Sequence, residues 1–365
     1  MTIRTRRSLA ILAVVGLVPA LAACSGDDAP GETGGASAPA VSADGELSGT
    51  VTLVTHDSFA LSDGLLESFE EESGLEVEHV AAGDAGALVN QLVLTQDSPL
   101  GDVVYGVDNT FASRAVEAGV FDPYMPADVD PSVTAQVEEG LEGLTPIDRG
   151  DVCLNVDTAW FDDAGIEPPA TFEELTDEQY ADLTVVTNPA TSSPGFAFLL
   201  ATVSAFGEDG WQDYWAELAD NGLRVTDGWS DAYYVEFSGA GEGGERPIVL
   251  SYATSPAATV TEDGSASTTA ALLDTCFRQV EYAGVLAGTD NPDGARALVD
   301  FLASEPVQAD IPGTMYMYPA DESVELPAEW EQFAPLAEEP HDVAAPEIAE
   351  RRDEWIQQWT ATVIG

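Results

Sequence analysis

Apolar and polar positions along this chain follow two periods, and each period predicts a type of element. Residues 49–55, 75–80 and 102–107 are short β-branched or alternating runs, which predict strands. Between them, residues 63–72 and 85–94 carry apolar side chains at helical spacing. The order strand–helix–strand–helix–strand predicts a parallel α/β layer.

The same pattern resumes after residue 146. It predicts strands at 151–156, 183–187, 223–226, 247–252 and 276–286, and helices at 195–205, 211–219, 291–304 and 346–364. In the last helix Trp355 and Trp359 share one face, which favours docking of that helix. Two α/β layers, joined near 147–148 and again near 280–281, predict two lobes with a ligand cleft between them.

The first residues are typical of an export signal. Arginines 4, 6 and 7 precede the apolar stretch 9–23, which spans about 22 Å as a helix and is shorter than the ~30 Å membrane core. The stretch ends in Leu21-Ala-Ala-Cys24, which resembles a bacterial lipobox. This resemblance implies a signal peptide over 1–23 and a lipid on Cys24. An ordinary signal peptide that contains a cysteine is the alternative.

Residues 24–46 are rich in Gly, Ser, Pro, Ala and acids, a composition typical of a flexible tether. The folded body therefore begins near residue 47. We expect an extracytoplasmic protein that is lipid-anchored to the membrane of a bacterial cell and touches that membrane only through Cys24.

Charge narrows the choice of partners. Among 365 residues, 11 Lys+Arg oppose 66 Asp+Glu, giving a net charge of −55, and every basic residue is an arginine. Such a surface repels phosphates, so we expect no nucleic-acid binding. The acidity serves solvation, or life in a salty habitat; a cationic ligand would also fit it. Since 45% of the residues are hydrophobic, the body can bury a core.

Cys153 and Cys276 both lie in predicted strands. In an oxidising compartment an isolated pair favours a disulfide, and two buried free thiols are the alternative. Neither has a neighbouring His or Cys at metal-ligand spacing, so no metal site is expected.

The sequence does not favour an enzyme. It has three histidines, His56, His79 and His341, and no nucleophile, zinc-protease or phosphate-loop motif. His56 follows the first strand and is adjacent to Asp57 and Ser58, but neighbours in one chain segment cannot converge as a triad must.

Loops near the predicted strand ends are rich in aromatic and hydroxyl residues. They are "THDSF" (55–59), "GDAG" (83–86), "NPATSSPG" (188–195), "DGWSDAYY" (227–234), "SYATSP" (251–256) and "GTMYMYP" (313–319). Loops at the carboxyl ends of neighbouring strands converge, so we expect these segments to line one cleft.

These blocks, with "DVVYGVDNT" (102–110), resemble the thiamine-binding periplasmic proteins of ABC importers, in order, from about residue 51 to 359. The resemblance implies an α/β, two-lobed periplasmic-binding-protein fold of type II, with a ligand cleft between the lobes and hinge crossings. We place lobe 1 at 47–147 and 279–325, and lobe 2 at 148–278 and 326–365. It further implies a monomer that captures thiamine or its phosphates, closes, and delivers the ligand to a permease, with no cofactor.

Carried over by position, the resemblance implies that Asp84 and Ala85 meet the aminopyrimidine and that Ser192 and Ser193 hold a hydroxyl or phosphate oxygen. It implies further ligand contacts from Trp229, Tyr252, Ala253, Thr254, Ser255, Tyr316 and His56. His56 stands where relatives carry Tyr, and Tyr316 where some carry Trp. A cation over such aromatic faces gains roughly 0.5–2 kcal/mol.

Other readings stay open. Adjacent Tyr233 and Tyr234 would suit a ferric-iron receptor of the same fold class, and the acids and aromatics would suit a polyamine receptor. A secreted phosphatase or other hydrolase is a third class.

Overall fold

The computed structural model describes residues 47–241 and 243–365. The signal peptide, the tether and the lipidation site Cys24 lie outside the described residues. In the described part, no helix has the length and apolar character needed to cross a membrane.

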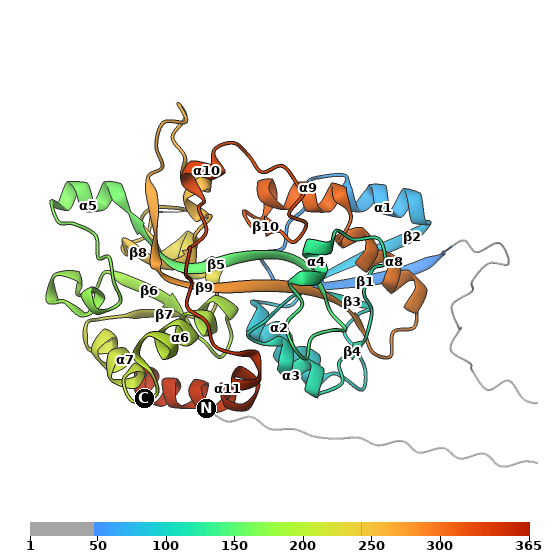
Figure 1. Cartoon of the computed structure of the whole chain (residues 1–365), viewed down its shortest axis with the longest axis horizontal. Helices are drawn as coiled ribbons and strands as arrows, with labels where there is room; N and C mark the ends of the chain where they lie inside the picture. Colours follow the sequence, from blue (N-terminus) through green and yellow to red (C-terminus); the bar gives the residue numbers. More distant parts are fainter. Residues whose placement is uncertain (1–46, 242) are drawn as a thin grey trace, which may run out of the picture. The chain divides into compact units, whose positions relative to one another are not determined.

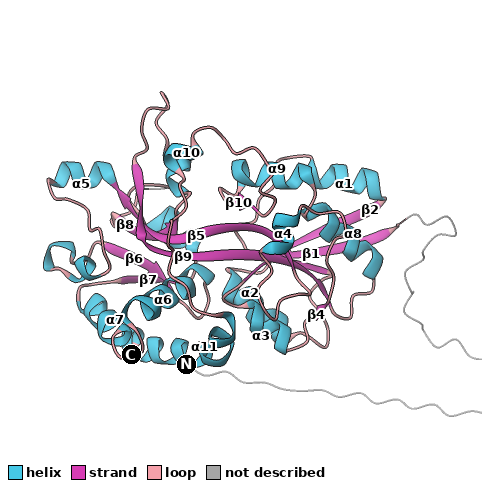
Figure 2. Cartoon of the chain, viewed as in Figure 1, coloured by secondary structure: helices cyan, strands magenta, loops and turns pink. Residues whose placement is uncertain are grey.

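Ten described strands form one sheet, in the order β2-β1-β3-β9-β5-β8-β6-β7, with β4 and β10 added to the side (Figure 2). The strands are β1 (Gly49–Thr55), β2 (Leu75–Ala81), β3 (Val103–Asp108), β4 (Phe121–Asp122), β5 (Thr145–Asp157), β6 (Thr184–Thr187), β7 (Arg224–Thr226), β8 (Ile248–Tyr252), β9 (Thr269–Leu286) and β10 (Tyr318–Pro319). Pairing is parallel in β2-β1-β3 and in β8-β6-β7, as the sequence predicts, and antiparallel where β9 and β5 join them.

The helices are α1 (Leu65–Ser73), α2 (Ala85–Leu94), α3 (Ala112–Glu117), α4 (Pro131–Ala135), α5 (Thr158–Ala164), α6 (Ser193–Phe206), α7 (Trp211–Asp220), α8 (Pro292–Leu302), α9 (Glu305–Thr314), α10 (Trp330–Phe333) and α11 (Ala345–Trp359). Short helical turns cover Asp231–Glu236 and Ser255–Thr259. Trp355 and Trp359 of α11 are fully buried, so this helix is docked as expected.

Side-chain alternation divides the core between the two faces of the sheet. Val103 and Tyr105 of β3 belong to one cluster with α8 and α9, whereas Val104 and Val107 belong to a second with α2, α6 and α11 (Figure 1). The mixed α/β class is thereby confirmed.

The long strands β5 and β9 run through the middle of the sheet (Figure 1). β3 pairs with 281–285 of β9, and β8 pairs with 152–156 of β5. We call the strands β1–β3 the first end of the sheet and β6–β8 the second end. The sequence prediction caught only parts of β5 and β9, because buried polar residues interrupt their apolar pattern.

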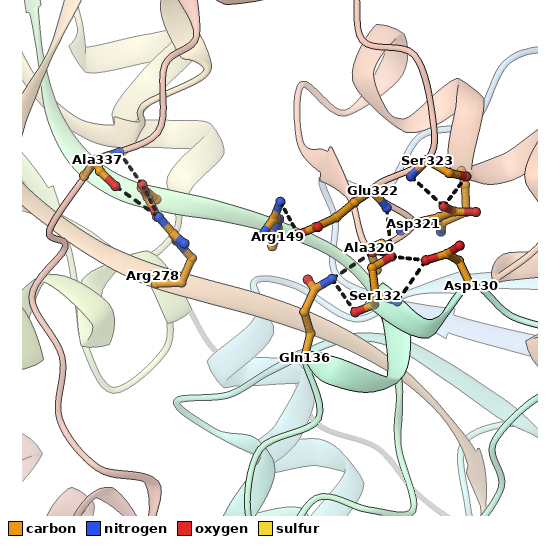
Figure 3. A network of polar contacts seen from close by, with 12 residues as sticks. Asp130, Ser132, Gln136, Arg149, Arg278, Ala320, Asp321, Glu322, Ser323 and Ala337 are labelled. Atoms are coloured by element: carbon orange, nitrogen blue, oxygen red, sulfur yellow. Dashed lines mark hydrogen bonds and ion pairs between the residues drawn. The ribbon is translucent and has the colours of Figure 1, made fainter.

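The segment after β10 is tied to these long strands by polar contacts (Figure 3). Arg149 pairs with Glu322 at 2.9 Å. Farther along, Arg278 pairs with Asp151, and the Asp151 Oδ2 atom accepts the N–H of Ala337 at 2.7 Å. The chain therefore follows β5 and β9 between the two ends of the sheet before α11 begins.

Cys153 of β5 and Cys276 of β9 are joined as a disulfide, with their Cα atoms 4.3 Å apart. Both side chains are fully buried, beside Ala253 and Ala337. The bond thus links the two strands that connect the ends of the sheet.

Candidate functional site

A cavity of about 610 Å³ lies where the loops that follow the parallel strands meet. The first end of the sheet contributes His56, after β1, and Asp84, after β2. The second end contributes Ser193, Trp229 and Thr254, after β6, β7 and β8. The carboxyl ends of parallel strands are where α/β proteins hold small ligands.

Most of the expected contact residues line this cavity. They are His56, Asp84, Ala85, Ser193, Trp229, Tyr252, Thr254, Ser255 and Tyr316. Two expected residues do not line it. Ser192 is fully buried, where its hydroxyl contacts Thr187 and caps α6, and Ala253 is packed beside the disulfide.

One wall of the cavity is aromatic. The ring of Trp229 stacks on Tyr233, with centroids 4.9 Å apart and planes 16° apart, and it contacts Tyr234 and Tyr252 edge-on. Trp229 Nε1 donates to Ser251 Oγ at 3.0 Å, which fixes the ring. Tyr316 lines the cavity from the segment between α9 and β10, and its φ of 54° is a left-handed conformation seldom adopted by bulky residues.

Asp84 connects the two ends of the sheet. Its Oδ1 atom accepts the N–H of Ala85 at 2.7 Å and that of Ser193 at 3.2 Å, and its Oδ2 atom accepts the N–H of Trp229 at 2.9 Å. Burial of the carboxylate raises the pKa of Asp84, while the N–H of Trp229 and its other partners oppose the rise. The Asp84 carboxylate thus uses most of its hydrogen-bonding capacity within the protein. Its Oδ2 atom still has a lone pair that can accept a hydrogen bond from a ligand.

Close packing of α2 against the loop before α6 supports the contacts that Asp84 makes between the two ends of the sheet. A Cβ on Gly86 would lie 2.7 Å from the backbone of Thr191, so only glycine lets α2 approach that loop so closely. Beside it, Ala87 N–H donates to the carbonyl of Thr191 at 2.9 Å.

The sequence analysis missed Glu281, a buried carboxylate of β9 that lines the cavity and is 4% exposed. Its Oε2 atom lies 3.2 Å from the Tyr105 hydroxyl and 3.7 Å from His56 Nε2. The Tyr105 hydroxyl donates to Asp148, whose carboxyl is also hydrogen-bonded to Glu281. Acids are so frequent in this chain that composition could not single out Glu281; an acid within the apolar run of β9 is the available signal.

The pKa values of the two buried carboxyls, Asp148 and Glu281, are shifted in opposite directions. Burial and the repulsion of Glu281 hold the pKa of Asp148 well above its usual range. For Glu281 burial acts in the same direction, but attraction to His56 and hydrogen bonds from its neighbours outweigh it and lower the pKa. Within this pair Asp148 is therefore the carboxyl that holds a proton more tightly, and Glu281 is the one that loses it more readily.

His56 is held in a specific orientation. Its Nδ1 atom accepts the N–H of Ser58 at 3.1 Å, so the ring proton sits on Nε2 and faces Glu281. Burial would lower the pKa of His56, but the carboxylate of Glu281 outweighs burial and raises it. A bulge at Gly106 makes room for the ring, since a Cβ there would lie 2.1 Å from His56 Cδ2.

Two hydroxyls at the cavity lack a partner among the described residues. The Thr254 and Tyr233 hydroxyl oxygens are buried and make no hydrogen bond there. Both residues line the cavity, although the two oxygen atoms themselves are covered by neighbouring atoms.

Ser58 and His56 are not arranged as a nucleophile and its base. Ser58 reaches His56 through its backbone N–H, and its hydroxyl lies 3.4 Å from Ser230 Oγ instead. In the described part of the chain, no three His, Cys, Asp or Glu side chains are arranged to hold a metal ion. The tyrosines of the ferric-iron reading differ in setting, since Tyr233 is buried against Trp229 while Tyr234 is 48% exposed.

Comparisons with known proteins confirm the two-lobed, type II periplasmic-binding-protein fold. Residues 98–337 match the family model described as bacterial extracellular solute-binding protein. The chain is 31% identical over 319 residues to a thiamine-binding periplasmic protein of Brucella suis biovar 1 (strain 1330), covering 86% of this chain and 91% of the relative. Among solved structures, one titled periplasmic thiamin binding protein is 28% identical with a TM-score of 0.72, covering 86% of this chain and 96% of that one. Iron-bound HitA from Pseudomonas aeruginosa shares the fold at 20% identity and a TM-score of 0.68, over 86% and 99% of the two chains.

Proposed function

The chain belongs to the bacterial extracellular solute-binding proteins, within the family of the thiamine-binding periplasmic proteins, and from this premise we propose that it captures thiamine outside the cytoplasm and delivers it to an ABC importer. The observation that carries the proposal is a cavity with an aromatic wall on one end of the sheet and carboxylates reaching in from the other.

Thiamine joins an aminopyrimidine to a permanently cationic thiazolium ring. A flat cation gains roughly 0.5–2 kcal/mol over an aromatic face, which Trp229 and Tyr252 offer. The exocyclic amine is a donor, and Asp84 Oδ2 has a lone pair for it.

Delivery requires that ligand favour a closed form, and a ligand shifts a conformational balance only through contacts it makes in that form. Asp84 belongs to the proposed lobe 1 and Trp229 to lobe 2, so a ligand touching both would favour closure. We propose that β5 and β9 serve as the hinge between the lobes and that the permease recognises the closed form.

The relatives support an extracytoplasmic location. The family is extracytoplasmic, and we propose that cleavage before Cys24 and lipidation of that residue anchor the protein to the membrane through the tether 24–46. The protein then acts as a monomeric receptor and catalyses no reaction.

A titration followed by intrinsic tryptophan fluorescence tests this function, because Trp229 lies in the cavity wall. We expect a saturable change with thiamine and none with spermidine. Addition of ferric citrate should leave the protein colourless, whereas iron bound by tyrosinates absorbs visibly. A response to spermidine or iron with none to thiamine would replace the proposal by the polyamine or iron reading.

A further inference from the structure

The histidine of the cavity wall faces a buried carboxylate, and a cationic ligand would meet the same carboxylate. We infer that His56 and Glu281 form a proton-exchange pair: the cation of the ligand replaces the second ring proton of His56 as the counter-charge of Glu281. Binding is then coupled to the release of a proton into the solvent. The inference rests on the proposed function, because it needs a permanently cationic ligand.

Both side chains of the pair are buried at the cavity wall. His56 is 6% exposed and Glu281 is 4% exposed, and the His56 Nε2 atom lies 3.7 Å from the Glu281 Oε2 atom. Among the described residues that line the cavity, His56 is the one side chain able to carry a positive charge. A buried carboxylate is stable only with a counter-charge or hydrogen bonds. Glu281 therefore has two candidate counter-charges, the imidazolium of His56 and the cation of a ligand.

The neutral form of the His56 ring already fits the site. Its Nδ1 atom accepts the N–H of Ser58 at 3.1 Å, while the proton on Nε2 faces Glu281. The charged ring carries a proton on both nitrogens, so charging His56 breaks the bond from Ser58. When the Nδ1–H bond breaks again, the proton goes to the solvent and the electron pair stays on Nδ1, where it accepts Ser58 N–H.

This exchange reaches a contact between the two ends of the sheet. Ser58 lines the cavity in the loop after β1, and its hydroxyl lies 3.4 Å from Ser230 Oγ in the loop after β7. The neutral His56 ring holds the backbone of Ser58 and therefore fixes this loop beside the second end of the sheet. Ligand charge and loop position thus favour the same form of His56.

The surroundings of His56 act on its proton in both directions. Burial lowers the pKa of His56, but the carboxylate of Glu281 outweighs burial and raises it, and Asp84 and Asp57 add to the rise. Attraction to carboxylates is therefore what keeps the second proton on the ring. The titratable groups around the ring are Asp57 after β1, His79 of β2, Asp84 after β2, Tyr105 of β3, Glu281 of β9, and Asp148 of β5, which is hydrogen-bonded to Glu281.

The aromatic face proposed for the thiazolium ring is close to the pair. Tyr252 contacts Trp229 edge-on, and after burial the carboxylate of Glu281 is the main cause that raises the pKa of Tyr252. A cation on this face would repel an imidazolium at His56, and the poorly screening interior makes such repulsion strong. Ligand cation and second ring proton therefore compete for one site.

Thermodynamic linkage gives the direction of the pH effect. If binding lowers the pKa of His56 by about one unit, thiamine binds about tenfold more tightly above both pKa values than below them. In the protein without ligand, the pKa of His56 lies above its ordinary value of 6.5. The affinity should therefore rise as the pH increases from about 6 to 8. A histidine that only packs against the ligand would give no such rise.

Calorimetry and NMR on the purified protein test the exchange. Titration with thiamine in buffers of different ionisation enthalpy should show release of about 0.3–1 proton per ligand near pH 7. Histidine-detected NMR should show the pKa of His56 falling by at least about one unit at saturating thiamine. Thiamine binding without proton release, or with an unchanged pKa of His56, would overturn the inference. Failure of thiamine to bind would instead overturn the proposed function.

Two histidine variants assign the proton. His56→Gln has no titrating ring, so thiamine should release no proton and its affinity should not rise with pH. His79→Gln is the matched control, since His79 contacts Thr55 and does not line the cavity, and this variant should keep the parent slope. Asp108, with a pKa of about 7, remains in both variants and cannot account for a difference between them. Release that persists in His56→Gln, or that disappears equally in the control, would contradict the assignment.

A neutral ligand tests the role of charge on the unchanged protein. Deazathiamine has the shape of thiamine but carries a neutral thiophene in place of the thiazolium ring. It should bind more weakly than thiamine, release no proton and show no rise in affinity with pH. Equal proton release by the two ligands would show that shape and not charge expels the proton, and would overturn the inference.

Discussion

Replacement of Trp229 by alanine tests the aromatic wall of the cavity. The substitution removes a ring that is stacked on Tyr233 and touches Tyr252 edge-on. A ligand loses a cation–π contact of roughly 0.5–2 kcal/mol and an apolar surface of about 1.5–3 kcal/mol. Since the two terms overlap, we expect a loss of about 2–4 kcal/mol, which is a fall in affinity of roughly 30- to 1000-fold.

In the protein without ligand, the same substitution should cost less free energy of folding than it costs in ligand binding. Trp229 is partly exposed, and its removal breaks one hydrogen bond to Ser251 and one stacked pair. These contribute roughly 0.5–1.5 kcal/mol each. The melting temperature of the empty protein should therefore fall by only a few degrees, and Ser251 keeps Ser255 as a partner at 2.7 Å.

Two further variants separate binding from stability. Trp229→Phe retains a ring face without the Nε1 donor, so its affinity should fall less than tenfold. Trp355→Ala removes a fully buried ring of α11 and should cost roughly 3–5 kcal/mol of stability, with little change in the affinity of the folded protein.

Calorimetry for affinity and scanning calorimetry for stability give both quantities for each variant. Normal affinity in Trp229→Ala, or an equal loss in Trp355→Ala, would refute the reasoning. Trp229 would then be a core residue and not part of a binding wall.

Three further predictions concern single groups. Oxythiamine, which has a carbonyl in place of the exocyclic amine, should bind at least tenfold more weakly than thiamine because Asp84 would face an acceptor; calorimetry showing equal affinities would exclude Asp84 as the pyrimidine partner. Cys153 and Cys276 should be bonded in the exported protein, closing a chain separation of 123 residues that is worth ~4–5 kcal/mol in the chain-entropy model; alkylation of both thiols in native, unreduced protein, seen by mass spectrometry, would contradict this. Burial raises the pKa of Asp108 to about 7, so the folded state binds this proton more tightly than the unfolded one and stability falls as pH rises from about 4 to 7; Asp108→Asn should flatten this part of the stability-against-pH curve, and an unchanged curve from denaturant unfolding would show that Asp108 does not titrate there.

The strands and helices of the first end of the sheet could be predicted because their apolar pattern is regular. The expected bounds of β1 and α2 coincide with the structure. β5 was predicted only from residue 151, since Asp148 and Arg149 look like loop residues in sequence although the structure buries or half-buries them. The sequence cannot show that a polar residue will find a buried partner in another strand.

α9 was not predicted, for a different reason. Its interior contains Pro312, and a proline there usually ends a helix, whereas Pro306 lies in the first turn, where proline is tolerated. Burial of Val307 and Ile311 against the sheet stabilises the helix despite Pro312, and such tertiary packing does not appear in a local pattern.

The sequence predicted which loops form the site, because it placed each loop at the end of a strand. Strand order brings the loops after β1, β2, β6, β7 and β8 together, so most residues carried over from the resemblance line one cavity. The sequence could not show which polar atoms of the site already have hydrogen-bond or charge partners within the protein. The bonds of Asp84 to Ser193 and Trp229, and the 3.7 Å separation of Glu281 from His56, depend on the approach of distant segments.

Calorimetric titration of the purified protein with thiamine at neutral pH is the most direct test of the central claim, that this cavity is a thiamine site. The account predicts one binding event with a Kd below 1 μM, which corresponds to about −8 kcal/mol or better, and a melting temperature that rises with thiamine concentration. No heat and no rise in melting temperature at millimolar thiamine would contradict it.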